Sequence, residues 1–128
     1  MHVLRIMRVS KDGLPTVKED TRDCLGVRYK KPRVNDISID VNGMVIRGSG
    51  GLSVTLPPKT NFKEHLLEPS IPARECFRID LAYFEEHQHL FFRQDSSTHG
   101  LIEPSHDMHI DEYHEHLAAT RNLWEVDK

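Results

Sequence analysis

The chain has 128 residues, 38% of them hydrophobic, and a formal net charge of −3, which suits one domain with an ordinary core. This mixed charge does not favour a broad nucleic-acid or membrane surface, and no apolar run approaches the roughly 18 residues of a transmembrane helix. Residues 1–10 are too short and too interrupted by charge for a signal peptide. Lone cysteines at 24 and 76 have no metal or redox spacing, which favours reduced thiols and a cytoplasmic location. We therefore expect a single domain over residues 1–128.

The first half of the chain predicts strands separated by a long polar loop. Residues 3–9 carry apolar side chains at most positions and predict a buried first strand. Residues 14–36 are polar, contain two prolines and are expected to form a loop. Residues 37–47 then form a second β-like run, and residues 52–56 a third.

A glycine cluster lies between the second and third runs, at Gly48, Gly50 and Gly51. Glycine accepts positive φ angles and allows a ligand to approach the backbone. Ser53 and Thr55 follow at a spacing of two, which on a strand places both hydroxyls on one face. Two interpretations stay open: a hairpin with solvent-facing hydroxyls, or a tight turn that delivers two hydroxyls to a binding surface.

The second half predicts more short strands and one helix. The strands are expected at residues 76–80, 89–93 and 99–103, with a turn at 94–98. Residues 107–126 predict a helix, because apolar side chains recur at helical spacing on one face, at Ile110, Tyr113, Leu117 and Trp124. This pattern is typical of an α+β fold with short, mostly antiparallel strands and a C-terminal amphipathic helix.

Nine histidines raise the question of a metal site, since seven of them follow residue 80. No Cys-x-x-Cys or His-Glu-x-x-His pattern is present. His114 and His116 would lie on different faces of a helix, about 200° apart. We therefore expect no metal site.

A different set of residues suits the binding of a dinucleotide. The basic run at residues 28–33, the Ser53–Thr55 pair and His99 would together supply an anion clamp, hydroxyls for a ribose and an imidazole. Cleavage of the nicotinamide–ribose bond of NAD passes through a state that resembles an oxocarbenium ion. A protein promotes it by holding the pyrophosphate and ribose and stabilising positive charge. NAD used as a substrate is therefore the expected ligand.

Two ordered motifs resemble a known family. The first is Arg33-x-x-Asp36-Ile37, then Gly43, then Gly50-Gly51-x-Ser53-Val54. The second is Gln94-Asp-Ser96 and Thr98-His99-x-x-Ile102-x-Pro104, followed by Met108, Tyr113 and Leu117. In this order they resemble a family of bacterial type VI secretion effector toxins. The resemblance implies an ADP-ribosyltransferase-like fold, action in the cytoplasm of a target cell after secretion, and neutralisation by an immunity protein.

The resemblance also implies roles for individual residues. Ser53 and His99 fall on positions that line the family's active cleft, so both are candidate catalytic residues. In this hypothesis Arg33 contacts phosphate, Ser53 and Thr55 hold the ribose, and His99 orients the substrate. The glutamate used by many ADP-ribosyltransferases has candidates by proximity only, at Glu103, Glu112 and Glu115.

The alternative function is a non-catalytic binding module with the same fold and a degenerate cleft. It is favoured by Leu52, which stands where the family often has a hydroxyl residue before the serine. An enzyme requires Ser53 and His99 to face a common cleft, within about 12 Å of each other, so that both contact one substrate.

Overall fold

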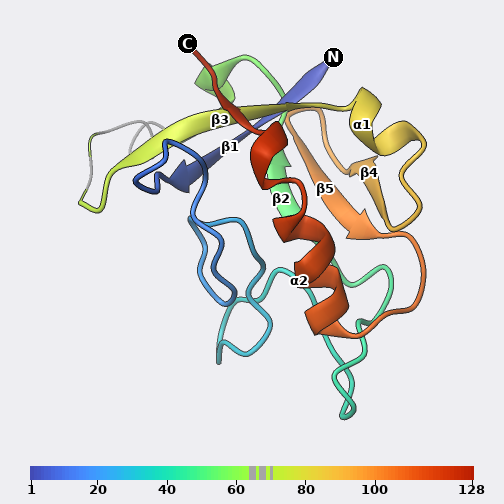
Figure 1. Ribbon diagram of the computed structural model, residues 1–128. Helices are drawn as coiled ribbons and strands as arrows, with labels where there is room; N and C mark the ends of the chain where they lie inside the picture. The colour runs from blue at the N-terminus through green and yellow to red at the C-terminus, as the bar shows by residue number, and fades with distance from the viewer. Residues whose placement is uncertain (64–65, 67–68, 70) are drawn as a thin grey trace.

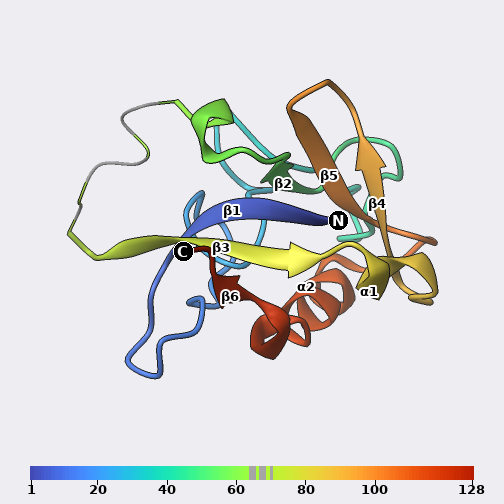
Figure 2. The same ribbon diagram turned by 90° about the horizontal axis from the view of Figure 1, so that it is seen from above.

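The computed structural model describes residues 1–63, 66, 69 and 71–128, and these form an α+β fold around one antiparallel sheet (Figures 1 and 2). The sheet has six strands in the order β4–β5–β2–β1–β3–β6. Their bounds are His2–Arg8 for β1, Leu52–Thr55 for β2, Arg74–Asp80 for β3, Leu90–Gln94 for β4, His99–Pro104 for β5 and Glu125–Val126 for β6. The predicted class of short antiparallel strands with a C-terminal helix is confirmed.

Helix α2, Ile110–Ala118, covers one face of the sheet, as the view from above shows (Figure 2). The shorter helical segments are α1 (Ala82–Glu85), η1 (Lys59–Asn61) and η3 (Arg121–Leu123). One continuous core joins α2 to the sheet, and it includes Val3, Met7, Leu52, Val54, Ile102, Tyr113 and Leu117. No helix in the described part of the chain is long and apolar enough to span a membrane.

Strand β1 holds the sheet together because it lies between β2 and β3. It pairs with β3 along its whole length, from His2 opposite Asp80 to Arg8 opposite Arg74. Side chains of a strand alternate between the two faces of the sheet. Val3 and Met7 therefore join the core under α2, whereas the even-numbered residues of β1 project to the opposite face. That opposite face carries the cavity described below.

The β-like run predicted at residues 37–47 is not a strand of the sheet. Only isolated bridges form there, such as Ile39 with Val45. Asp40 explains the difference, because its Oδ1 accepts hydrogen bonds from the backbone N–H groups of Asn42 (2.8 Å) and Met44 (2.9 Å). A turn that is closed by a side chain competes with sheet pairing. The segment therefore forms a local turn with isolated bridges instead of a strand of the sheet.

The predicted helix at residues 107–126 is too long at both ends. His109 caps the N-terminus of α2, its Nδ1 accepting from the N–H of Asp111 at 3.1 Å. At the other end, the Thr120 hydroxyl donates to the carbonyl of Leu117 at 2.6 Å and accepts from the indole of Trp124 at 3.0 Å. Trp124 is buried as expected, but it lies in an irregular segment beyond the end of the helix.

Gly50 in the glycine cluster before β2 is a position where glycine is required. Gly50 has a φ of +145°, and a Cβ atom there would lie 1.9 Å from the carbonyl oxygen of Asp36. The same carbonyl accepts a hydrogen bond from the N–H of Gly51 at 2.9 Å. Gly50 thus lets the loop at Asp36 pack directly against the start of β2.

Candidate functional site

A cavity of about 530 Å³ opens on the sheet face that α2 does not cover. Its floor consists of outward-facing side chains of three adjacent strands: Leu4 and Ile6 of β1, Ser53 and Thr55 of β2, and His99 of β5. The structure therefore brings together three of the four predicted site residues, namely Ser53, Thr55 and His99.

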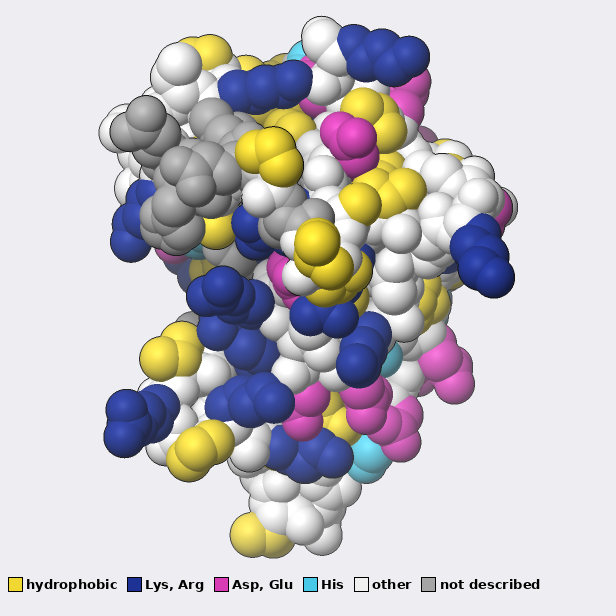
Figure 3. Space-filling model, turned by 90° about the vertical axis from the view of Figure 1, so that its left-hand side faces the viewer, with side chains coloured by type: hydrophobic (Ala, Val, Ile, Leu, Met, Phe, Trp, Pro, Cys, Tyr) yellow, Lys and Arg dark blue, Asp and Glu magenta, His cyan; other side chains and the backbone are white. Residues whose placement is uncertain are grey.

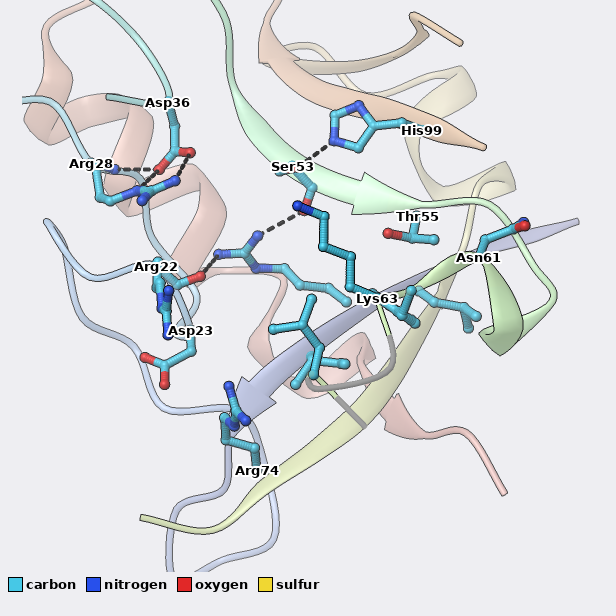
Figure 4. A pocket seen from close by; sticks show the side chains of 15 residues that line it. Arg22, Asp23, Arg28, Asp36, Ser53, Thr55, Asn61, Lys63, Arg74 and His99 are labelled. Atoms are coloured by element: carbon cyan, nitrogen blue, oxygen red, sulfur yellow. Dashed lines mark hydrogen bonds and ion pairs between the residues drawn. The ribbon is translucent and has the colours of Figure 1, made fainter. Parts of the chain in front are cut away.

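Ser53 and His99 are in direct contact. Antiparallel pairing of β2 with β5 places Thr55 opposite His99 and Ser53 opposite Leu101. From this register the imidazole of His99 reaches diagonally to Ser53, and its Nε2 is hydrogen-bonded to Ser53 Oγ (Figure 4). The two side chains therefore meet the requirement of a common cleft.

Asp95 continues this chain of hydrogen bonds on the far side of the imidazole. Its Oδ1 lies 2.7 Å from Nδ1 of His99. The hairpin between β4 and β5 holds the two residues opposite each other, because the His99 carbonyl accepts from the N–H groups of Asp95 (3.1 Å) and Ser96 (3.2 Å). With the Nδ1 hydrogen donated to the carboxylate, Nε2 is the acceptor for the Ser53 hydroxyl.

Arg5 of β1 fixes the backbone of the site from below. The residue is buried, and its guanidinium donates to the carbonyls of Ser53 (2.7 Å), Cys24 (2.8 Å) and Arg22 (3.1 Å). Burial lowers the pKa of the guanidinium to about 10, so it remains charged at neutral pH. Arg5 thereby ties β2 to the polar loop that forms one wall of the cavity.

Positive charge predominates around the cavity although the whole chain carries a formal charge of −3. Among the described residues, five cationic side chains line it against two carboxylates: Arg5, Arg22, Arg28, Lys63 and Arg74 against Asp23 and Asp36. On the side of the molecule in Figure 3, Lys and Arg side chains gather around a hollow. The cavity is thus suited to an anionic ligand.

The two carboxylates of the cavity wall are already paired. Asp36 accepts from Nε (3.1 Å) and Nη2 (2.9 Å) of Arg28, a bidentate pair visible in Figure 4. Asp23 lies 3.0 Å from Nε of Arg8. By contrast, the side chains of Arg22 and Lys63 form no hydrogen bond or ion pair with any other residue that the structure describes. They are the cations most available to a ligand.

Arg33, the fourth predicted site residue, lies in a neighbouring cavity of about 470 Å³ rather than beside Ser53. The two cavities share Arg22 and Arg28 as a common wall. Lys18 and Lys31 also line the second cavity, which makes it basic as well. The predicted phosphate contact and the predicted ribose contacts therefore occupy adjacent spaces.

None of the three candidate glutamates lines the cavity among the described residues. Glu103 is buried, and its carboxylate accepts hydrogen bonds from both Nη2 (2.8 Å) and Nε (3.1 and 3.2 Å) of Arg93. Glu112 and Glu115 are exposed on α2, across the sheet. The part of the cavity lining that the structure describes therefore contains no unpaired glutamate of the kind that many ADP-ribosyltransferases use.

A second group of titratable side chains lies away from the cavity, between α2 and the start of β4. The rings of His89 and His116 stack at 4.0 Å, and Nδ1 of His89 is 2.9 Å from Nε2 of His106. His87 lies edge-on to both members of the stack. No group of three or more His, Cys, Asp or Glu side chains within the described ranges is arranged to hold a metal ion.

Acidification should destabilise the protein through this histidine cluster. Burial, followed by the charge of His89, lowers the pKa of both His87 and His116. The unfolded chain then takes up protons at the ordinary histidine value of about 6.5, before the folded chain does, so stability falls as the pH drops through that value and on to the lower folded values. Thermal unfolding followed between about pH 7.5 and pH 5.5 should show a falling melting temperature.

Two variants make this prediction specific. The double variant His87→Gln/His116→Gln should have a shallower pH dependence, with a remaining slope from His114, whose pKa burial also lowers. The neighbouring Gln88→Ala removes no ionisable group and should retain the wild-type slope. An identical slope in the double variant and the wild type would contradict the assignment.

Sequence reasoning missed Asp95, Arg5 and Arg22. Asp95 falls inside the turn predicted at residues 94–98, and the predicted strands would pair residue 93 with residue 99. Only the observed register, with Gln94 opposite Gly100, brings Asp95 beside His99. Arg5 lies between apolar residues in a strand predicted to be buried, which is a sign of a buried charge with specific partners. Arg22 lies in an irregular loop and has no comparable sign in the sequence.

A comparison of the chain with family models, curated proteins and solved structures found no match.

Proposed function

We propose that the protein is a toxin or effector domain that binds NAD and cleaves its nicotinamide–ribose bond, with transfer of ADP-ribose to a target or to water. In this proposal its fold is related to that of the ADP-ribosyltransferases, it acts in the cytoplasm of a target cell, and a dedicated immunity protein neutralises it. The observation that carries the proposal is the meeting of Ser53, Thr55 and His99 on the floor of one basic cavity.

The two adjacent cavities support a dinucleotide in particular. A ligand with two nucleoside halves joined by a pyrophosphate would place its halves in the two cavities and its charge over the shared Arg22 and Arg28. Arg33 would then contact the phosphate of the adenosine half from the second cavity, and Ser53 and Thr55 would hold the nicotinamide ribose. His99 would orient that ribose through its ring.

The absence of a glutamate from the described cavity lining favours the alternative, a non-catalytic binding module with a degenerate cleft. In that case the cavity binds a dinucleotide or another anionic ligand without cleaving it. The two functions differ in one measurable product, free nicotinamide.

Calorimetric titration of NAD into the full chain, with chromatographic detection of nicotinamide, tests the proposal. Binding with nicotinamide release is expected, and Thr55→Val should weaken binding about tenfold by removing one ribose hydrogen bond. Arg47→Ala, an exposed arginine outside both cavities, is the matched control and should bind as the wild type does. Binding without release would favour the binding module, and no binding of NAD would overturn the proposed use of NAD.

Growth of a bacterial host separates a toxin from a binding module in the cell. Wild-type expression should arrest growth, and Ser53→Ala or His99→Ala at equal protein abundance should relieve the arrest. Normal growth with abundant, folded wild-type protein would contradict the toxin function.

A further inference from the structure

The chain of hydrogen bonds from Ser53 to Asp95 indicates a role for the Ser53 hydroxyl beyond ribose binding. Its order is hydroxyl, imidazole, carboxylate: Ser53 Oγ to His99 Nε2, and His99 Nδ1 to Asp95 Oδ1 at 2.7 Å. In this order the carboxylate fixes the tautomer and direction of the ring, and the ring accepts the proton of the hydroxyl as it attacks. A serine that only held a ribose would need no such carboxylate.

We propose that Ser53 is a nucleophile, with His99 as its general base and Asp95 as the positioning residue, and that the substrate is a phosphodiester. The reacting groups lie where a substrate can reach them, because the Ser53 and His99 side chains both line the 530 Å³ cavity. The His99 side chain is 35% exposed and the Asp95 side chain 33%. Arg5 holds the Ser53 carbonyl at 2.7 Å and so fixes the strand that presents the hydroxyl.

Charge selects the phosphodiester over a neutral carboxylic ester. The described cavity lining has an excess of cationic side chains over carboxylates, and those carboxylates are paired with Arg8 and Arg28. Arg22 and Lys63 would offset the charge on the non-bridging oxygens, which grows in the transition state of phosphoryl transfer. A neutral ester carries no charge in its ground state, so these side chains would not attract it into the cavity.

The reaction proceeds in two balanced steps. Ser53 Oγ forms a bond to phosphorus while the bond from phosphorus to the leaving oxygen breaks, and the hydroxyl proton passes to His99 Nε2 and on to the leaving alkoxide. Water then attacks phosphorus and the Oγ–phosphorus bond breaks. His99 takes a proton from that water and returns one to Oγ. The bond is made at phosphorus and not at a sugar carbon, so this activity needs no NAD and is independent of the function proposed above.

Covalent labelling with a fluorophosphonate, in the absence of NAD, tests the nucleophile. Ser53 Oγ should displace fluoride, and peptide mass spectrometry should find the adduct on Ser53. Thr55 is the internal control, because it lies on the same strand and lines the same cavity but has no imidazole partner among the described residues. It should remain unlabelled. Labelling should be lost in Ser53→Ala and slowed on the order of 10³-fold in His99→Gln.

Turnover of bis(p-nitrophenyl) phosphate tests the substrate class and the role of Asp95. Asp95→Asn should lower kcat on the order of 10²-fold with an unchanged KM, and Asp95→Glu should restore part of the rate. Asp107→Asn, an exposed carboxylate outside the cavity, should behave as the wild type does. Melting temperatures confirm that each variant is folded.

Three results would overturn the proposal. One is a folded wild-type chain that does not label at Ser53. Another is labelling that proceeds at the wild-type rate in His99→Gln. The third is faster turnover of p-nitrophenyl butyrate than of the phosphodiester, which would reject the phosphodiester as the substrate class.

Discussion

Replacing Arg5 with methionine should lower the free energy of unfolding by about 3–5 kcal/mol. Methionine fills a similar volume but has no donors, so the carbonyls of Ser53, Cys24 and Arg22 lose the partner that the guanidinium provides. Buried carbonyls without a hydrogen bond are costly, because the unfolded chain hydrates them fully. Urea denaturation of the wild type and variant measures the difference.

The control for Arg5 is Arg47→Met, a change at an exposed arginine that should alter stability by less than about 0.5 kcal/mol. Arg5→Lys should fall between the two, since one ammonium group cannot reach all three carbonyls. Wild-type stability in Arg5→Met would show that these bonds contribute nothing net. In addition, the release of the Ser53 carbonyl should slow any reaction at the cavity.

Replacing Tyr113 with phenylalanine should cost about 2–4 kcal/mol of stability. The buried hydroxyl donates to the carbonyl of Ile102 at 2.5 Å and accepts from the N–H of Leu52 at 3.0 Å. Burial raises the pKa of Tyr113, so the hydroxyl keeps its proton and can fill both roles. Phenylalanine preserves the ring packing but leaves one donor and one acceptor unpaired in the core.

Two measurements check the Tyr113 prediction. Denaturation gives the loss of stability, with the more exposed Tyr83→Phe as a control that should change it by less than about 0.5 kcal/mol. Hydrogen exchange of the Leu52 amide should also accelerate, because that N–H loses its acceptor. An unchanged exchange rate at Leu52 would contradict the assigned hydrogen bond. Leu52 pairs with Ile102 at the start of β2, so the Tyr113 hydroxyl connects α2 to β2 and β5, the two strands that carry Ser53 and His99.

The sequence predicted elements well where side-chain alternation and local turns agree. The strands at residues 3–9, 76–80, 89–93 and 99–103 all correspond to strands of the sheet, because each combines an apolar face with a clear turn. The strand-like run predicted at residues 37–47 is wrong. Their apolar side chains do reach the core, as Ile37 and Val45 show, but Asp40 closes a local turn before a ladder can form.

The contact between Ser53 and His99 could not be derived from local patterns. It depends on pairing between β2 and β5, which are not consecutive in the chain, and periodicity does not specify strand order. This contact was expected only from the resemblance of two separate motifs to one family. Asp95 likewise lies beside His99 only in the observed register of the β4–β5 hairpin, which the predicted turn at residues 94–98 does not specify. Trp124 led to an error of another kind. It is buried and falls at helical spacing, so the predicted helix ran past Thr120, although α2 ends at Ala118.

The strand order has a consequence for when the cavity can exist during synthesis. Its floor combines β1 from the start of the chain, β2 from the middle and β5 from near the end. Contacts between distant segments carry the largest loop-closure cost, so they form late and slow the folding of the whole domain. A ribosome must also release β5 before β2 gains its second neighbour. A nascent or truncated chain that ends before His99 therefore contains Ser53 without the imidazole that contacts it, and the floor of the cavity is incomplete until β5 has been made.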